Sequence, residues 1–154
     1  SVNIGCVRMT ERHLNQDPPN AEAVASAIVD IDAAIELAAK TVPLDKAVTV
    51  IGLAGSVTTV AAMALGLNKY DREAIHAGVI SSASVAKCAE RLLQMTREQR
   101  AALPYMHPGR VDVIGAGALV LDRIVKKLKV ESIVVSEQDI LDGIALSIAR
   151  KINA

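Results

Sequence analysis

The chain has 154 residues, a length typical of one globular domain, and its 51% apolar residues are enough to form a core. Seventeen basic residues balance seventeen acidic ones, which removes the overall electrostatic argument for binding nucleic acid or an acidic membrane. No apolar run reaches the roughly 18 residues of a membrane span, and no charged-then-apolar leader opens the chain. We therefore expect a cytoplasmic domain whose anion sites, if present, are local.

The core is expected to be aliphatic, because Phe and Trp are absent and Tyr70 and Tyr105 are the only aromatic residues. This composition predicts closely packed helices. Cys6 and Cys88 lie far apart without a CxxC spacing or a neighbouring His cluster, which indicates neither a disulfide framework nor a zinc site. We predict no metal ligands in this chain.

The N-terminal third is expected to contain one strand and one long helix. Apolar and polar residues alternate loosely over residues 2–10, which include β-branched types, and this pattern predicts a strand. Residues 10–12 favour a short helix. From Asn20, a suitable N-cap, aliphatic residues recur at helical spacing as far as Pro43.

Residues 47–53 (AVTVIGL) form a continuous β-branched run, which is typical of a strand buried on both faces of a parallel sheet. A helix is expected over residues 58–67. Residues 76–82 can form a short strand, whereas residues 84–95 favour a helix, and Thr96 is a candidate cap for a further turn that ends at Pro104.

The C-terminal part is expected to contain helix, strand and helix. Pro108 can open a helix whose apolar stripe continues to Lys129. Residues 131–136 (ESIVVS) predict a second buried strand, and residues 138–152 a terminal helix. Strands separated by helices indicate an α/β domain, here a single domain over residues 1–154.

Two or three strands make a thin sheet, so we expect an open edge and partner strands outside the chain. Ser1 enters a strand-like pattern without a preceding Met, which suggests that a segment of the parent protein comes before it. The missing sheet partners favour self-association, and we expect a homo-oligomer.

The most informative feature is the strand, glycine-containing turn and helix start over residues 50–59. Backbone N–H groups in the first turn of a helix lack intrahelical partners, so phosphate oxygens can accept from them. Gly55 permits close approach of an anion, and hydroxyl-bearing residues follow it. The alternative interpretation is a tight turn that the glycines form and Ser56 caps. The predicted phosphate-binding residues of this segment are Gly52, Gly55, Ser56 and Thr58.

Two further segments carry guanidinium groups. Arg8 can bind phosphate bidentately, with Glu11 nearby, although a solvated surface pair is the alternative interpretation. His107 and Arg110 lie at the N-terminus of a predicted helix and are candidate cleft residues. The alternative interpretation is that this segment only initiates the helix. His13 and His76 have no Ser or Cys partner at a motif spacing and are interpreted as structural.

Taken in order, four motifs of the chain resemble those of the exopolyphosphatase/guanosine-pentaphosphatase (Ppx/GppA) family over nearly its whole length. They are residues 3–11 (NIGCVRMTE), residues 52–56 (GLAGS), residues 108–117 with Pro108, Arg110 and Asp112, and Val135-Ser136 followed by Asp142-Gly143. The chain departs from the family pattern at Ser56, where Thr is usual, and at Ile140-Leu141, where Leu-Arg is usual.

The resemblance implies the second, C-terminal lobe of a two-domain enzyme with the ribonuclease-H-like architecture of actin-like ATPases and sugar kinases, incomplete at its N-terminus. It implies hydrolysis of terminal phosphoanhydride bonds of inorganic polyphosphate, with substrate in the cleft between the lobes. The phosphate loops and the catalytic carboxylate would precede Ser1, so no catalytic residue is expected here. Magnesium would serve the full-length enzyme, and the isolated chain, which binds none alone, would be inactive.

Three alternatives remain open from the sequence. The substrate can be guanosine pentaphosphate rather than polyphosphate. The chain can be a lobe of an actin-like kinase or ATPase, which nucleotide binding would distinguish. It can also be a noncatalytic dimerisation module, as the absence of catalytic segments suggests.

Overall fold

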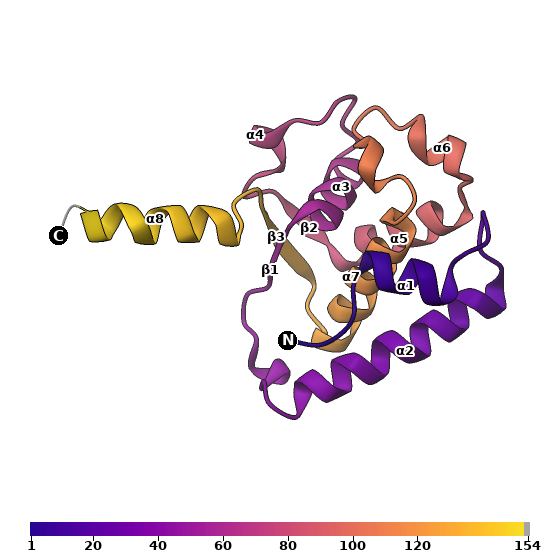
Figure 1. Ribbon diagram of the computed structural model, residues 1–154, viewed down its shortest axis with the longest axis horizontal. Helices are drawn as coiled ribbons and strands as arrows, with labels where there is room; N and C mark the ends of the chain where they lie inside the picture. Colours follow the sequence, from indigo (N-terminus) through magenta and orange to yellow (C-terminus); the bar gives the residue numbers. More distant parts are fainter. Residues whose placement is uncertain (153–154) are drawn as a thin grey trace.

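The computed structural model describes residues 1–152, which fold into helices around a small three-stranded sheet (Figure 1). The elements in chain order are α1 (Cys6–His13), α2 (Ala21–Ala39), η1 (Leu44–Lys46), β1 (Ile51–Leu53), α3 (Gly55–Ala64), α4 (Arg72–Ile75), β2 (Val79–Ser81), α5 (Ser82–Gln94), α6 (Arg97–Ala101), η2 (Pro108–Arg110), α7 (Ile114–Leu128), β3 (Ser132–Ser136) and α8 (Ile140–Ile152).

The sheet is mixed and has the strand order β1-β3-β2. β1 runs parallel to β3, with Gly52 opposite Val135, whereas β2 runs antiparallel to β3, with Ile80 opposite Ile133. The predicted α/β class is confirmed, and β1 is an edge strand of the described sheet, as expected. Because β1 and β3 point the same way, the segments that follow them meet at one edge of the sheet.

Burial alternates along the strands. Gly52 is buried, whereas the side chains of Ile51 and Leu53 are 60% and 47% exposed. The expectation that residues 47–53 form a strand buried on both faces is therefore wrong, since only one face of the described sheet carries buried side chains. The strand is also shorter than expected and begins at Ile51.

Helix α7 lies at the centre of the packing because it joins two apolar clusters. Ile114 and Val125 belong to a cluster with α3, α5 and the sheet, while Ala116 and Leu119 belong to a second cluster with α1 and α2. Small residues over positions 115–118 (GAGA) let neighbouring helices approach α7 closely. The largely aliphatic core and the close helix packing agree with the expectation from composition.

The first element is the helix α1, and the strand predicted for residues 2–10 is wrong. Cys6, Met9 and His13 face the protein at helical spacing, with Met9 fully buried, whereas Arg8 and Glu11 are exposed. The buried residues therefore recur with the helical period of about 3.6 residues and not with the two-residue alternation of a strand. Burial against α2 and α7 stabilises the helical arrangement.

Most other elements fall where the sequence predicts them. Asn20 caps α2 by accepting a 2.8 Å hydrogen bond from the N–H of Ala23, and Thr96 forms a capping box with Gln99 at the start of α6. The helix predicted from Pro108 is wrong in its first turns. The hydrogen bond from the N–H of residue 111 to the carbonyl of Pro108 tightens this segment into the 3₁₀ helix η2, and α7 begins later.

Helix α8 projects away from the rest of the chain (Figure 1), two residues later than its predicted start. Its exposed apolar side chains are Ile140, Leu141, Ile144, Leu146, Ile148 and Ile152. None of the helices that the structure describes combines the length and the hydrophobicity needed to cross a membrane.

Helix α2 offers a matched test of the packing. Replacing fully buried Ile31 by Ala is expected to lower the free energy of unfolding by about 2–5 kcal/mol, because it removes apolar contacts and leaves a cavity. Val29→Ala, at a position 70% exposed on the same helix, is expected to change it by less than about 0.5 kcal/mol. Urea denaturation checks both values, and equal losses would contradict the assigned faces of α2.

Candidate functional site

The turn between β1 and α3 exposes backbone donors. Ala54 has φ of 70° and ψ of 171°, and α3 begins without any side-chain cap. Among residues 1–152, no acceptor pairs with the N–H groups of residues 55–57, whereas the N–H of Thr58 donates to the carbonyl of Ala54 at 3.1 Å. The alternative interpretation that Ser56 caps this turn is therefore wrong, and the free donors form an electropositive patch.

Arg110 lies directly over this turn. A Cβ atom added to Gly55 would be 2.5 Å from the Arg110 Cζ atom and 2.6 Å from Nη2, so only glycine lets the guanidinium lie there. Arg110 Nη1 donates to Thr59 Oγ1 at 3.2 Å. The side chain is half-buried, and no carboxylate among the described residues forms an ion pair with it. A cation thus lies against the residue at which the run of free N–H groups begins.

The hydroxyl groups of the first turn of α3 bond within the protein. Thr59 Oγ1 donates to the carbonyl of Gly55 at 2.8 Å, and Thr58 Oγ1 lies 3.4 Å from the same oxygen. Both threonine side chains are buried. Thr58 Oγ1 also lies 2.7 Å from the hydroxyl of Tyr70. The predicted residue Thr58 therefore lies at the turn, with its hydroxyl directed at Tyr70.

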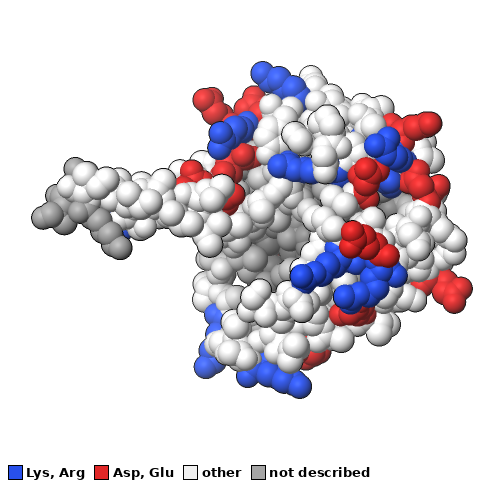
Figure 2. Space-filling view, viewed as in Figure 1, with Lys and Arg blue, Asp and Glu red and all other residues white. Residues whose placement is uncertain are grey.

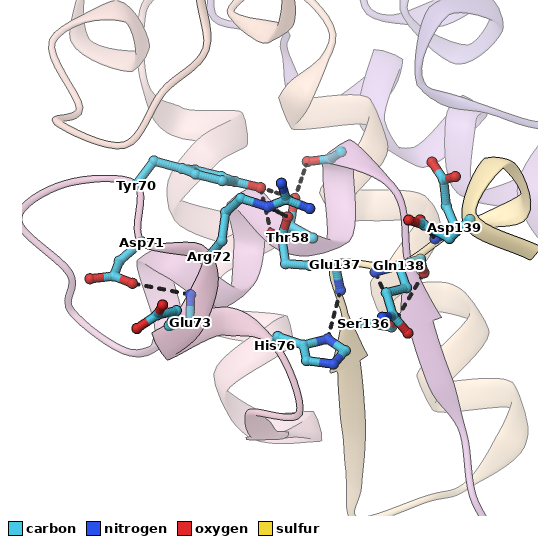
Figure 3. Close-up of polar contacts among 12 residues, drawn as sticks. Thr58, Tyr70, Asp71, Arg72, Glu73, His76, Ser136, Glu137, Gln138 and Asp139 are labelled. Carbon is cyan, nitrogen blue, oxygen red and sulfur yellow. Dashed lines mark hydrogen bonds and ion pairs between the residues drawn. The ribbon is translucent and has the colours of Figure 1, made fainter. Parts of the chain in front are cut away.

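Glu137 connects several segments at the carboxyl end of β3 (Figure 3). Its Oε1 atom accepts from the Tyr70 hydroxyl at 2.7 Å, and Oε2 accepts from Arg72 Nε at 3.2 Å. Its backbone N–H donates to Nδ1 of His76 at 3.2 Å. The carboxylate thereby holds the segment between α3 and β2 against the end of β3.

A pocket of about 470 Å³ opens beside the turn. His107 lies in its wall, where Nδ1 accepts from the N–H of Gly109 at 3.1 Å. Burial raises the pKa of the Tyr105 phenol above its ordinary value. The lining residues are Tyr70, Arg72, Pro104, Tyr105, Met106, His107, Pro108, Arg110 and Glu137.

Ser56 and Gly52 have packing roles at this site. The side chain of half-buried Ser56 lies against α7, where its Cβ atom would be 2.8 Å from a Cβ added to Gly117. A Cβ added to Gly52 would be 2.7 Å from Val57 Cγ1, so this glycine lets α3 pack closely on β1. Both residues position the turn, and their predicted contact with phosphate stays a prediction.

The structure thus brings Arg110 and His107 together with the turn at Gly55, which the sequence could only treat as separate segments. Arg8 and Glu11 are exposed on α1, and Arg8 Nη1 donates to Asn3 Oδ1 at 2.6 Å. No hydrogen bond or ion pair within residues 1–152 joins either of them to the turn. Their predicted place in the cleft stays a prediction.

Sequence reasoning missed Tyr70, Arg72 and Glu137. One signal was available for Glu137, because it follows a strand whose carboxyl end meets that of β1. Tyr70 and Arg72 carry no motif, and only the tertiary fold brings them to the pocket.

The charge pattern of the surface is mixed. Figure 2 shows Lys and Arg interspersed with Asp and Glu over the visible face, while α8 forms a largely uncharged arm. This agrees with the zero net charge of the sequence. The face shown in Figure 2 presents no broad basic field.

Comparisons with known proteins agree with each other. The model of the Ppx/GppA phosphatase family matches residues 1–152. Exopolyphosphatase 2 of Mycobacterium tuberculosis is 48% identical over 153 residues, a match that covers 97% of this chain and 48% of that protein. The chain therefore spans about half the length of the curated relatives that it matches.

Solved structures of similar proteins also match nearly the whole chain. An exopolyphosphatase-like protein superposes with a TM-score of 0.95 at 39% identity, covering 98% of this chain and 50% of that one. The PPX-GPPA enzyme of Aquifex aeolicus superposes with a TM-score of 0.84 at 25% identity, covering 95% of this chain and 48% of that one.

Two glycine substitutions test the geometry of the turn. Gly55→Ala is expected to displace the flexible Arg110 side chain while changing the free energy of unfolding by no more than about 1 kcal/mol, because alanine favours helix. Gly117→Ala is expected to cost about 1–3 kcal/mol, because the new methyl group would press on Ser56 and Cys6 across helix interfaces. Denaturation curves measure the costs, and a crystal structure locates Arg110. An unmoved Arg110 in Gly55→Ala would contradict this geometry.

Proposed function

We propose, because the chain belongs to the Ppx/GppA phosphatase family, that it forms one wall of a site that hydrolyses terminal phosphoanhydride bonds of inorganic polyphosphate. The observation that carries the proposal is the Arg110 guanidinium lying against Gly55, the first residue of α3, where the N–H groups of the first turn have no acceptor among the described residues. A guanidinium can donate to two phosphate oxygens, and helix N–H groups can donate to a third. The relative named exopolyphosphatase 2 supports polyphosphate as the substrate.

The proposed architecture is the second lobe of a two-domain, actin-like enzyme built from ribonuclease-H-type domains. Two observations support it: the chain covers about half of each of the two solved structures described above, and its candidate site lies at the carboxyl ends of β1 and β3. Ligands commonly bind outside the carboxyl ends of the strands of an α/β sheet and at interfaces between domains. The catalytic carboxylate and the phosphate loops would then belong to the other lobe.

In this proposal the residues of the chain bind and orient the substrate. Arg110 and the N–H groups of residues 55–57 hold phosphate oxygens and offset negative charge as it redistributes during in-line attack by water. His107 and the pocket wall limit the path of the neighbouring phosphates. Proton abstraction from water is left to the other lobe, so the chain alone is expected to release no phosphate.

Magnesium belongs to the proposal for the full-length enzyme only. Within the described part of the chain, no three His, Cys, Asp or Glu side chains are grouped to hold a metal ion. Glu137, the carboxylate of the pocket, is already engaged by Tyr70 and Arg72. The residues present do not form a magnesium site of their own, and we assign no step of this chain to the metal.

Substitution of Arg110 tests the proposed site. Arg110→Ala is expected to weaken binding of inorganic tripolyphosphate about tenfold, because charge-assisted hydrogen bonds are lost. Isothermal titration calorimetry measures the affinity. The affinity of Arg8→Ala for tripolyphosphate separately tests whether Arg8 contributes to phosphate binding.

Arg97→Ala is the matched control, since Arg97 is exposed and already paired with Asp112 at 2.6 Å. Unchanged affinity is expected for this control. Wild-type protein that does not bind tripolyphosphate, or an Arg110→Ala variant that binds it equally well, would refute the site. Release of phosphate from polyphosphate by the pure chain would refute the assignment of catalysis to the other lobe.

The chain is also proposed to form homo-oligomers through exposed apolar surface on α8 and the open edge at β1. The double variant Ile144→Glu, Ile148→Glu places charges one turn apart on α8 and is expected to sediment as a monomer, whereas the wild type is expected to self-associate. Sedimentation velocity distinguishes them. A monomeric wild type at high concentration would contradict the proposal.

A further inference from the structure

A continuous series of polar contacts joins the two walls of the pocket through the first turn of α3. On one side, Arg110 donates to Thr59, whose hydroxyl donates to the carbonyl of Gly55. On the other, Thr58, the preceding residue in the same turn, bonds to the hydroxyl of Tyr70, which bonds to Glu137. The segments involved are far apart in sequence: Tyr70 and Glu137 are 67 positions apart.

The direction of these hydrogen bonds follows from the groups present. A phenol carries one hydrogen, and an ionised carboxylate can only accept, so the Tyr70 hydrogen goes to Glu137. The Tyr70 oxygen then accepts from Thr58, which is the partner able to donate. The position of Thr58, and with it the first turn of α3, is thereby tied to the carboxylate.

We propose that Glu137 is a positioning residue for phosphate binding, acting through Tyr70 and Thr58 to hold the free N–H groups of α3 in line with Arg110. The inference rests on the proposed function, because it concerns the same pocket. Figure 3 shows Tyr70 reaching across to Thr58 and Glu137 from the segment before α4.

The contact with Tyr70 is the important one for this role. Arg72 is 71% exposed and its ion pair with Glu137 is open to solvent, so this pair contributes little to holding the carboxylate. Arg72 does offset the negative charge of Glu137, whose side chain is 11% exposed and lines a pocket that is to receive phosphate. A carboxylate in the pocket wall repels phosphate. Its presence is compatible with phosphate binding if it also holds the binding groups in position.

Removal of single hydroxyl groups separates positioning from fold stability. Tyr70→Phe is expected to weaken tripolyphosphate binding about fivefold, the effect of one hydrogen bond, and to do so equally at low and high salt. Ser82→Ala is the control: it removes a half-buried hydroxyl that donates to the carbonyl of Val130 and does not line the pocket, and its affinity is expected to match that of the wild type.

Arg72→Ala is expected to weaken tripolyphosphate binding only at low salt, because it leaves the negative charge of Glu137 without a neighbouring cation and salt screens the resulting repulsion.

The double variant Tyr70→Phe, Thr58→Val is expected to bind tripolyphosphate as Tyr70→Phe alone does, because both substitutions break the same hydrogen bond. Glu137→Gln, which keeps an acceptor for Tyr70, is expected to retain binding that Glu137→Ala loses, and this pair repeats the test if Tyr70→Phe fails to fold.

The outcomes separate the two proposals. If the wild type does not bind tripolyphosphate, the proposed function fails and the positioning role fails with it. If the wild type and Arg110→Ala differ as expected, but Tyr70→Phe lowers only the melting temperature and leaves the affinity unchanged, Glu137 has a structural role alone. Additive effects of Tyr70→Phe and Thr58→Val would also overturn the inference.

Discussion

The close approach of Arg110 to Gly55 is the contact on which the candidate site depends. A side chain at residue 55 would occupy the space of the guanidinium, and a side-chain cap on α3 would use the N–H groups that remain free. With neither present, a half-buried cation lies against the first residue of α3, and the first three N–H groups of this helix have no acceptor among residues 1–152. Such an arrangement is unfavourable when empty and favourable when an anion is bound, because phosphate oxygens satisfy both groups together.

The rest of the fold holds that contact in place. Parallel pairing of β1 and β3 brings the turn and Glu137 to the same edge of the sheet. Helix α7, which follows η2, fixes the segment that carries Arg110, and its small residues let α3 and α1 pack against it. The aliphatic core therefore does more than stabilise the domain, since its close packing determines where the donors point.

The sequence predicts local features well and tertiary ones poorly. Periodicity and capping residues located α2, α5, α6 and both C-terminal elements, and the run ending in Gly55 indicated the turn because glycine, hydroxyl residues and helix start are contiguous. The sequence does not predict helix α1 because, over only eight residues, the apolar spacing of a helix is hard to distinguish from the alternation of a strand. The exposed face of β1 could not be predicted, since it depends on how few helices cover the sheet. Tyr70 and Glu137 meet only through tertiary packing, which no local pattern encodes.

The central claim, that phosphate binds where Arg110 meets the first turn of α3, is tested most directly by amide NMR during titration with inorganic tripolyphosphate. We expect the largest changes in chemical shift at the N–H groups of Gly55, Ser56 and Val57 and at the Arg110 side chain, and we expect them to saturate together. Changes that are largest elsewhere, for example along α1 near Arg8, with the α3 N–H groups unaffected, would contradict it.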